Sequence, residues 1–276
     1  MQGTLYVVAT PVGNLEDITH RAVRILREVD AIACEDTRHT RHLLDHYGIT
    51  KPLVSYHEHN EAARAAELVE RLRGGENIAL VSDAGTPLVS DPGYRLVTLA
   101  IAGGISVAPV PGPSAVAAAL SASGLPCDQF RFLGFLPAKA SQRRRLLESL
   151  REETATTICY AAPHRSVDSL ADIVDVLGDR PAVVARELTK VHEEFLRGSA
   201  GELLRTLRER PAVKGEITLL IGRATSATTQ PVTDIPALVA ELMANGVERM
   251  DAIKRAASKL GISKREAYRV LASRRD

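Results

Sequence analysis

Short apolar runs alternate with helical stretches through the first half of the chain, and this alternation most constrains the fold. The apolar runs, rich in β-branched residues, are Leu5–Ala9, Ala31–Cys34, Leu53–Tyr56, Ile78–Ser82 and Ile105–Pro109. The helical patterns between them are Ile18–Val29, Thr40–Tyr47, Glu61–Leu72 and Tyr94–Ala102. Strands that are apolar throughout and alternate with helices indicate a parallel sheet covered on both faces. The sequence therefore predicts an α/β fold.

Turn residues follow three of the predicted strands. They form the segments Thr10–Asn14, Ser82–Gly93 and Pro111–Ser114. Ligands of such sheets bind beyond the carboxyl ends of the strands, so we expect the three loops to converge on one site.

Two aspartates and one serine of these loops suggest specific roles. Asp83 directly follows its strand, where its carboxylate can bind an amine, a hydroxyl or a cation, or can simply stabilise the turn. Asp91 precedes Pro92-Gly93 and is expected to serve the turn. Ser114 is a predicted N-cap of the helix that starts at Ala115, whose free N–H groups suit a carboxylate or a phosphate.

The second half has a less regular pattern, which predicts a mixed sheet. Strands or strand-to-helix turns are expected in residues 130–138, 156–164, 181–189, 193–203 and 214–222, and helices in Ser141–Glu152 and Ser166–Leu177. We expect α/β domains at residues 1–118 and 119–226, and a linker over residues 224–233. Residues 234–276 predict three short helices resembling a helix-turn-helix, with Ser263 and Glu266 as a capping box.

Composition narrows the protein class. The chain has 276 residues, 45% hydrophobic and 25% charged, which suffices for two packed domains. The N-terminus lacks the features of a signal peptide, no apolar run is long enough to span a membrane, and three scattered cysteines suggest neither a disulfide framework nor a zinc site. These features favour a cytoplasmic protein.

Charge is unevenly distributed along the chain. Residues 249–276 hold nine Lys and Arg against three acidic residues, a net charge of +6, so the first 248 residues carry −5 of the overall +1. Such a tail either binds a polyanion or keeps the protein in solution.

Several polar clusters leave alternatives open. His39, His42 and His46 have helical spacing, but they match no recognised ligand pattern, so no metal site is predicted. The neighbouring residues Glu35, Asp36, Arg38 and Arg41 form either the rim of an active site or a surface ion network. His57 and Glu58 lie in a surface loop or act as general acid or base. Arg143, Arg144 and Arg145 form a solvated helix face or contact phosphate.

Longer blocks of the sequence closely resemble the ribosomal RNA small subunit methyltransferase I family. The opening GTLYVVATPVGNLEDITHRAV is followed, in that family's order, by LVSYHEHNE, ALVSDAGTPLVSDPGYRLV, VPGPSAVAAALSASGLP, FLGFLPAK, YAAPHR, RELTKVHEEFLRG and KGEITLLIG. The resemblance covers essentially the whole chain. One departure is Ala161, which stands where an acidic residue is common in that family.

The resemblance implies the tetrapyrrole-methylase fold, with two α/β domains, S-adenosylmethionine (SAM) in the cleft between them, and usually a homodimer. It implies 2′-O-methylation of a cytidine ribose in the decoding region of 16S ribosomal RNA, within the small ribosomal subunit. The cofactor-binding residues it implies are Pro11, Val12, Gly13, Asp83, Gly85, Thr86, Ser114, Ala115, Tyr160, Ala162, Glu216 and Thr218.

The base that activates the ribose hydroxyl stays open among Asp36, His57, Glu58 and Asp83. Two other functions are alternatives: a tetrapyrrole C-methyltransferase of the same fold, and a non-catalytic RNA-binding factor of ribosome assembly. The basic tail favours an RNA substrate over a small macrocycle.

Overall fold

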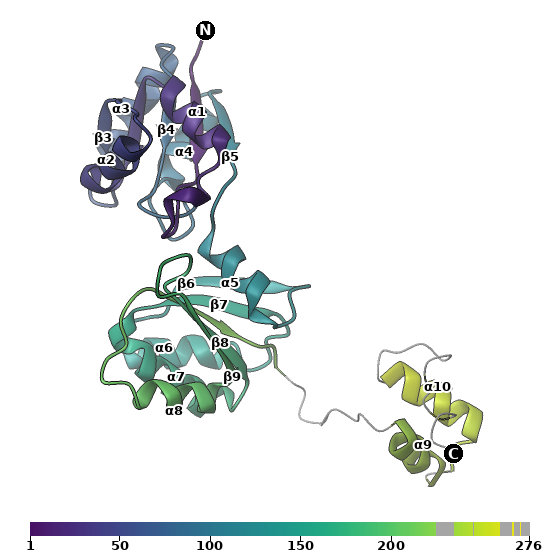
Figure 1. Cartoon of the computed structure of the whole chain (residues 1–276). Coiled ribbons are helices and arrows are strands. Elements are labelled where there is room, and N and C mark those ends of the chain that lie inside the picture. Colours follow the sequence, from purple (N-terminus) through teal and green to yellow (C-terminus); the bar gives the residue numbers. More distant parts are fainter. Residues whose placement is uncertain (225–234, 245, 260–266, 268–270, 272–276) are drawn as a thin grey trace. The chain divides into compact units, whose positions relative to one another are not determined.

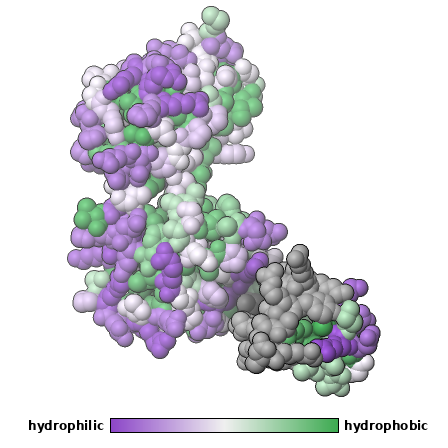
Figure 2. Space-filling view, turned by 45° about the vertical axis from the view of Figure 1, so that its right-hand side comes forward, coloured by the Kyte–Doolittle hydropathy of each residue, from purple (hydrophilic) through white to green (hydrophobic). Residues whose placement is uncertain are grey.

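The computed structural model describes residues 1–224, 235–244, 246–259, 267 and 271. The chain divides into two compact units, residues 1–224 and residues 225–276. The first unit contains two five-stranded sheets, each the centre of one lobe (Figure 1). The two lobes are also distinct in the space-filling view (Figure 2). No helix in the described part of the chain is both long and apolar enough to cross a membrane.

The first sheet is parallel throughout, with strand order β3-β2-β4-β1-β5. Its strands are β1 (Thr4–Val8), β2 (Ala31–Cys34), β3 (Leu53–Ser55), β4 (Ile78–Leu80) and β5 (Ser106–Val110). The connections contain the 3-10 helix η1 (Leu15–Asp17) and the helices α1 (His20–Glu28), α2 (Thr37–His46), α3 (Glu61–Arg73) and α4 (Tyr94–Ala102). The predicted strands, helices and parallel sheet are confirmed, with ends that differ by less than one helical turn.

Both faces of the first sheet are covered by helices, which explains the continuous apolar runs. Ile78 and Leu80 pack in a cluster with α3 and α4. Ala79 and Val81, which point the other way, pack in a cluster with α1 and α2. Because alternate residues face opposite cores, every position of a central strand such as β4 is apolar.

The second sheet is mixed, as predicted, with strand order β6-β7-β10-β8-β9. Its strands are β6 (Phe130–Phe135), β7 (Thr156–Ala161), β8 (Pro181–Arg186), β9 (Glu194–Ser199) and β10 (Ile217–Ile221). Only β6 and β7 pair in parallel; the pairs β7–β10, β10–β8 and β8–β9 are antiparallel. The helices are α6 (Ala140–Glu148), η2 (Pro163–Arg165), α7 (Ser166–Leu177) and α8 (Ala200–Arg208).

The helix α5 (Ala115–Ser123) joins the two lobes, since it follows β5 yet packs on the second sheet (Figure 1). Val116 and Ala119 lie in one cluster with Ile158, Val183 and Leu220 of that sheet. The helices α6, α7 and α8 contribute to the core on the opposite face. The expected boundary between residues 118 and 119 falls inside α5.

The second unit contains α9 (Ile235–Ala244) and α10 (Arg249–Lys259). These helices share their own apolar cluster, which includes Leu238 and Ile253. The third predicted helix, the Ser263–Glu266 capping box and nearly all of the expected linker lie outside the described residues.

Candidate functional site

The three loops at the carboxyl ends of β1, β4 and β5 meet, as predicted. Thr10 and Gly85 exchange two backbone hydrogen bonds, with N···O distances of 2.9 and 3.0 Å. The Thr86 hydroxyl donates to the carbonyl oxygen of Pro113 at 3.1 Å. Ser114 caps α5 by accepting a hydrogen bond from the N–H of Ala117 at 3.4 Å. The loops therefore form one connected rim at this edge of the first sheet.

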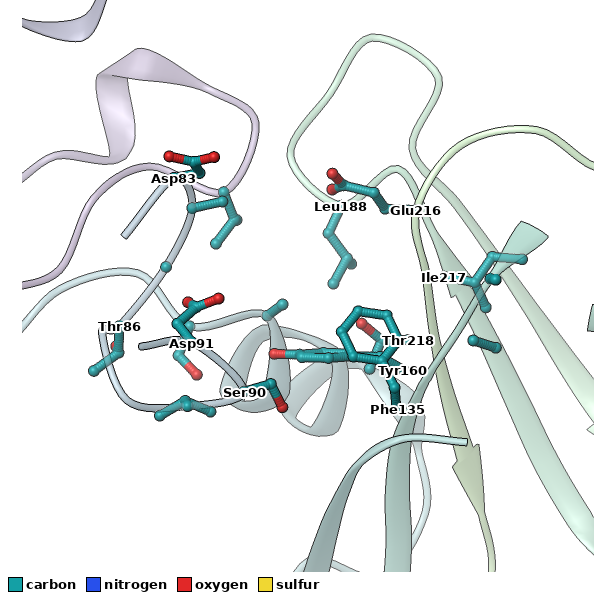
Figure 3. Close-up of a pocket in the computed structure, with 18 of the residues that line it drawn as sticks. Asp83, Thr86, Ser90, Asp91, Phe135, Tyr160, Leu188, Glu216, Ile217 and Thr218 are labelled. Atoms are coloured by element: carbon teal, nitrogen blue, oxygen red, sulfur yellow. The ribbon is translucent and has the colours of Figure 1, made fainter. Parts of the chain in front are cut away.

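A cavity of about 440 Å³ lies between this rim and the second sheet. It is lined by ten of the twelve predicted cofactor-binding residues: Val12, Asp83, Gly85, Thr86, Ser114, Ala115, Tyr160, Ala162, Glu216 and Thr218. Figure 3 shows Asp83 and Asp91 on one side of the cavity and Leu188, Glu216 and Tyr160 on the other. A cavity of this size suits a ligand as large as a nucleoside cofactor.

Pro11 and Gly13 do not line the cavity. A Cβ at Gly13 would lie 2.8 Å from the carbonyl oxygen of Leu188 and 2.9 Å from the Thr189 hydroxyl. Gly13 therefore lets the loop after β1 approach the loop between β8 and β9 closely.

Three further lining residues, Phe135, Pro163 and Leu188, were not predicted from the sequence. Of the others, Glu35 was a candidate for the rim of an active site, Ala84, Val89, Ser90 and Asp91 belong to the predicted loop Ser82–Gly93, and Ala161 and Ile217 lie between residues of the implied cofactor set. Glu35 directly follows β2, so the rule that ligands bind beyond strand ends points to it as well. Asp91 was expected to serve only the turn, but it also forms part of the cavity wall.

Carboxylates dominate the polar side of the cavity. Glu35, Asp83, Asp91 and Glu216 line it, and no Lys, Arg or His among the described residues does so. Glu216 is ion-paired with Lys190 at 3.1 Å, but the other three carboxylates have no ion pair with any described residue. A cavity with this charge favours a cationic ligand.

Two of these carboxyl groups have raised pKa values. Burial raises the pKa of Asp91 to about 6. The charges of Glu35 and Asp83 contribute to this increase, and a hydrogen bond from Ser82 opposes it. Burial and the charge of Asp83 also raise the pKa of Glu35. Partly buried like charges of this kind are typical of functional sites.

The loops on either side of the cavity contain unusual backbone conformations. Leu88 and Ser90 have φ angles of 72° and 69°, and Glu187 and Thr189, which flank Leu188, have 52° and 65°. Side chains with a Cβ rarely adopt this left-handed region, and such residues concentrate at binding sites. No other non-glycine residues in the described part of the chain have positive φ.

A second cavity, of about 350 Å³, adjoins the first. Phe135, Ala161 and Ala162 line both cavities. The remaining walls of the second are Leu136, Pro137, Ala138, Arg165 and Ser169.

Asp36, a candidate base, lies outside the first cavity. Its carboxylate caps α2 by accepting the N–H of Arg38 at 2.8 Å, and it pairs with the Arg38 guanidinium at 2.7 Å. The hydrogen bond from the Arg38 side chain holds the pKa of Asp36 well below its usual range. The backbone N–H of Asp36 donates to the Asp83 carboxylate at 3.1 Å, so Asp36 helps to position Asp83.

His57 and Glu58 also lie outside the first cavity. Asn60 Oδ1 accepts the backbone N–H of His57 at 2.9 Å, so its Nδ2 faces His57 Nε2, at 3.1 Å. Nδ1 of the same ring is buried and has no hydrogen-bond partner among the described residues. Glu58 is exposed to solvent.

The arginine run on α6 is not a uniformly solvated helix face. Arg143 is buried and ion-paired with Asp172 at 2.6 Å, and its guanidinium also donates to the carbonyl oxygens of Pro137 and Ala138. Arg144 pairs with Asp172 and Asp175. Only Arg145 is exposed without a side-chain partner among the described residues.

Metal ligands are not clustered in the described part of the chain, where no group of three or more His, Cys, Asp or Glu residues could hold an ion. Cys34, Cys127 and Cys159 are free thiols.

Comparisons with known proteins agree with this architecture. The family model for Tetrapyrrole (Corrin/Porphyrin) Methylases matches residues 4–204. A protein from Halalkalibacterium halodurans named "Ribosomal RNA small subunit methyltransferase I" is 47% identical over 274 residues, which cover 98% of this chain and 94% of that protein.

Solved structures share the fold at low identity. A diphthine synthase matches with a TM-score of 0.63 and 16% identity, over 80% of this chain and 90% of that one. A uroporphyrin-III-C-methyltransferase from Thermus thermophilus matches with a TM-score of 0.56 and 20% identity, over 81% of this chain and 96% of that one. The predicted two-lobed α/β fold is thereby confirmed.

Proposed function

Because the chain belongs to the tetrapyrrole methylase family, and within it to the ribosomal RNA small subunit methyltransferase I family, we propose that it methylates 16S ribosomal RNA with SAM as the methyl donor. The acceptor in this proposal is the 2′-hydroxyl of a cytidine in the decoding region. The single observation that carries the SAM assignment is the cavity of about 440 Å³ with carboxylates and no lining cation among the described residues.

The residues of the cavity fit SAM chemically. SAM carries a sulfonium, an ammonium and a carboxylate, so its net charge is +1, whereas its product S-adenosylhomocysteine is neutral overall. Asp83, Asp91 and Glu35 suit the positive groups. The start of α5, where Ser114 and Ala115 line the cavity, provides N–H groups that suit the cofactor's carboxylate.

Bound SAM supplies an electrophilic methyl group for an in-line displacement. The chain's own contribution is to hold donor and acceptor in line and to exclude water, which provides much of the rate of such a reaction. The hydroxyl proton needs an acceptor, and we expect it among the four carboxylates that line the cavity, because Asp36, His57 and Glu58 lie outside it.

The remaining parts of the proposal concern partners. We propose that the substrate is RNA within the small ribosomal subunit, that the basic residues of the C-terminal unit help to bind it, and that the protein is a cytoplasmic homodimer. A body of charge −5 repels RNA, so residues 249–276, with a net charge of +6, offset that repulsion.

Transfer of a tritiated methyl group to small subunits from cells that lack this protein tests the function. We expect labelling of 16S RNA that resists alkaline hydrolysis at the modified ribose, and SAM binding in calorimetry that a chelator leaves unchanged. Asp83→Ala should abolish both signals, while the exposed Asp168→Asn should keep them. SAM binding without transfer to RNA would favour a tetrapyrrole substrate, and absence of SAM binding would favour a non-catalytic RNA-binding factor.

A further inference from the structure

The two adjoining cavities have opposite electrostatic character. The first is lined by Glu35, Asp83, Asp91 and Glu216. The second is lined by Arg165 and by no carboxylate residue. A cationic donor and an anionic acceptor therefore each have a matching cavity, on either side of a shared wall.

Arg165 is available to bind a ligand. It lies in η2, directly after the β7 segment that forms the wall between the cavities, and its side chain is partly buried. Within the described part of the chain, its guanidinium forms neither a hydrogen bond nor an ion pair. An arginine held in a cavity without a carboxylate partner suits a phosphate group, which its planar fork can bind through two hydrogen bonds.

Phe135 provides an aromatic surface at the junction of the two cavities. Phe135 lines both cavities and is 63% exposed. Its ring packs edge-on against the ring of Tyr160, with the ring centroids 5.2 Å apart. What sets Phe135 apart from other exposed apolar residues, such as Phe130 on the same strand, is that it lines both cavities. Unpaired RNA bases stack on such rings.

The far wall of the second cavity is held rigidly. Arg143 donates from Nη1 to the carbonyl oxygens of Pro137 and Ala138 at 3.3 and 3.4 Å, while its Nε donates to the buried Asp172 at 2.7 Å. Pro137 and Ala138 are both lining residues. The cavity is thus preorganised, which lowers the entropic cost of binding.

We propose that the second cavity binds the acceptor nucleotide, with Arg165 on a phosphate next to the target ribose and Phe135 stacked on its base. This inference rests on the proposed function, since it names the place where a single, unpaired nucleotide of the RNA enters the site. The shared wall of Phe135, Ala161 and Ala162 then separates the methyl donor from the nucleotide, leaving the ribose at the opening between them.

Arg165→Ala is the first test, with Arg145→Ala as the matched control. Arg145 is also unpaired among the described residues, but it lines neither cavity. With small subunits as the substrate, Arg165→Ala should lower kcat/KM about 10- to 100-fold, mainly through KM, since a charge-assisted hydrogen bond is lost. Its affinity for SAM should be unchanged, the salt slope of RNA binding should fall by about 0.7, and Arg165→Lys should restore part of the activity.

Phe135→Leu tests the stacking contact, with Phe130→Leu as its control. Phe130 lies on the same strand and is 52% exposed, but it lines neither cavity. Phe135→Leu should weaken binding of small subunits about tenfold, because an aliphatic side chain cannot replace base stacking. Phe130→Leu should bind them as the wild type does.

The possible results distinguish a failure of the proposed nucleotide site from a failure of the proposed function. If the wild type transfers no methyl group to RNA, the proposed function fails. If the wild type is active and Arg165→Ala behaves as Arg145→Ala does, the nucleotide site is refuted while the function stands. Loss of SAM affinity or of melting temperature in Arg165→Ala, without rescue by Arg165→Lys, also refutes it, because the residue would then serve the fold.

Discussion

Ionisation of Asp91 should govern how SAM binding depends on pH. The pKa of Asp91 is raised to about 6, chiefly by burial and further by the charges of Glu35 and Asp83. A cation bound in the same cavity stabilises the ionised carboxylate, so binding lowers this pKa and releases a proton near pH 6. SAM should therefore bind more tightly as the pH rises from 5 to 7.5, and more weakly as Asp91 becomes protonated.

The magnitude depends on how strongly solvent screens the interaction. Since Asp91 is only partly buried, we use a coupling of about 1.4 kcal/mol, which corresponds to a tenfold change in acidity between the free and bound protein. With a pKa of about 6 in the free protein, that coupling makes SAM bind about fivefold more weakly at pH 5 than at pH 7.5. S-adenosylhomocysteine lacks the sulfonium charge and should show a much smaller change.

Titration calorimetry from pH 5 to pH 8, with both ligands and in two buffers of different ionisation enthalpy, measures the affinity and the proton release. Asp91→Asn should remove the pH dependence near 6 and bring the two affinities closer together. The exposed Asp168→Asn, which lines no described cavity, should retain it. An Asp91→Asn variant with the wild-type pH profile, or equal profiles for the two ligands, would refute the electrostatic reasoning.

Three further perturbations test the fold and the tail. In urea unfolding, Asp172→Ala should lower the free energy of unfolding by about 3–5 kcal/mol, because it leaves the buried Arg143 guanidinium without its ion-pair partner. The Asp175 side chain is 64% exposed, so Asp175→Ala should lower it by less than about 1 kcal/mol. Similar losses in the two variants would contradict a stabilising buried pair. Gly93 has a φ of 139°, and a Cβ there would lie 2.8 Å from a buried leucine, so Gly93→Ala should lower the free energy of unfolding by more than about 2 kcal/mol. A Cβ at Gly48 meets nothing within 4 Å, so Gly48→Ala should lower it by only about 1 kcal/mol. Equal losses in the two variants would show that the clash at Gly93 relaxes. Deleting residues 234–276 should leave SAM affinity intact and make RNA binding less sensitive to salt, and an unchanged salt slope in a folded protein would exclude the tail from RNA binding.

The sequence predicts the elements of the first lobe far better than their order. The ends of β2 and α4 coincide with the predicted Ala31–Cys34 and Tyr94–Ala102. The position of β4 between β2 and β1 does not follow from the sequence, because strands apolar on both faces carry no information about their neighbours. Parallel pairing also joins segments far apart along the chain, so local turn chemistry cannot define it.

The convergence of the first-lobe loops can be predicted from strand ends, whereas the residues that the second lobe contributes to the cavity have no such signal in the sequence. The loops after β1, β4 and β5 follow from the parallel sheet, while the residues of the second lobe came from family resemblance alone. Leu188 and Phe135 reach the cavity from a loop and a strand of the second lobe, and neither has a local signal. Arg143 looked like part of a surface charge run, and its burial follows only from its partner Asp172, which is distant in sequence.

The strand β10 is the last strand of its sheet to be synthesised, yet it lies at the centre, between β7 and β8. Chains are made from the N-terminus, so all strands of the first sheet precede this one. Until β10 is added, β7 and β8 each have an unpaired edge, which can pair wrongly with another nascent chain. The same strand begins at Ile217 and carries Thr218 into the cavity, so insertion of β10 completes the sheet and this wall of the cavity together. A chain truncated before residue 217 lacks both, so a ligand of the cavity should stabilise the complete lobe more than a shorter nascent chain.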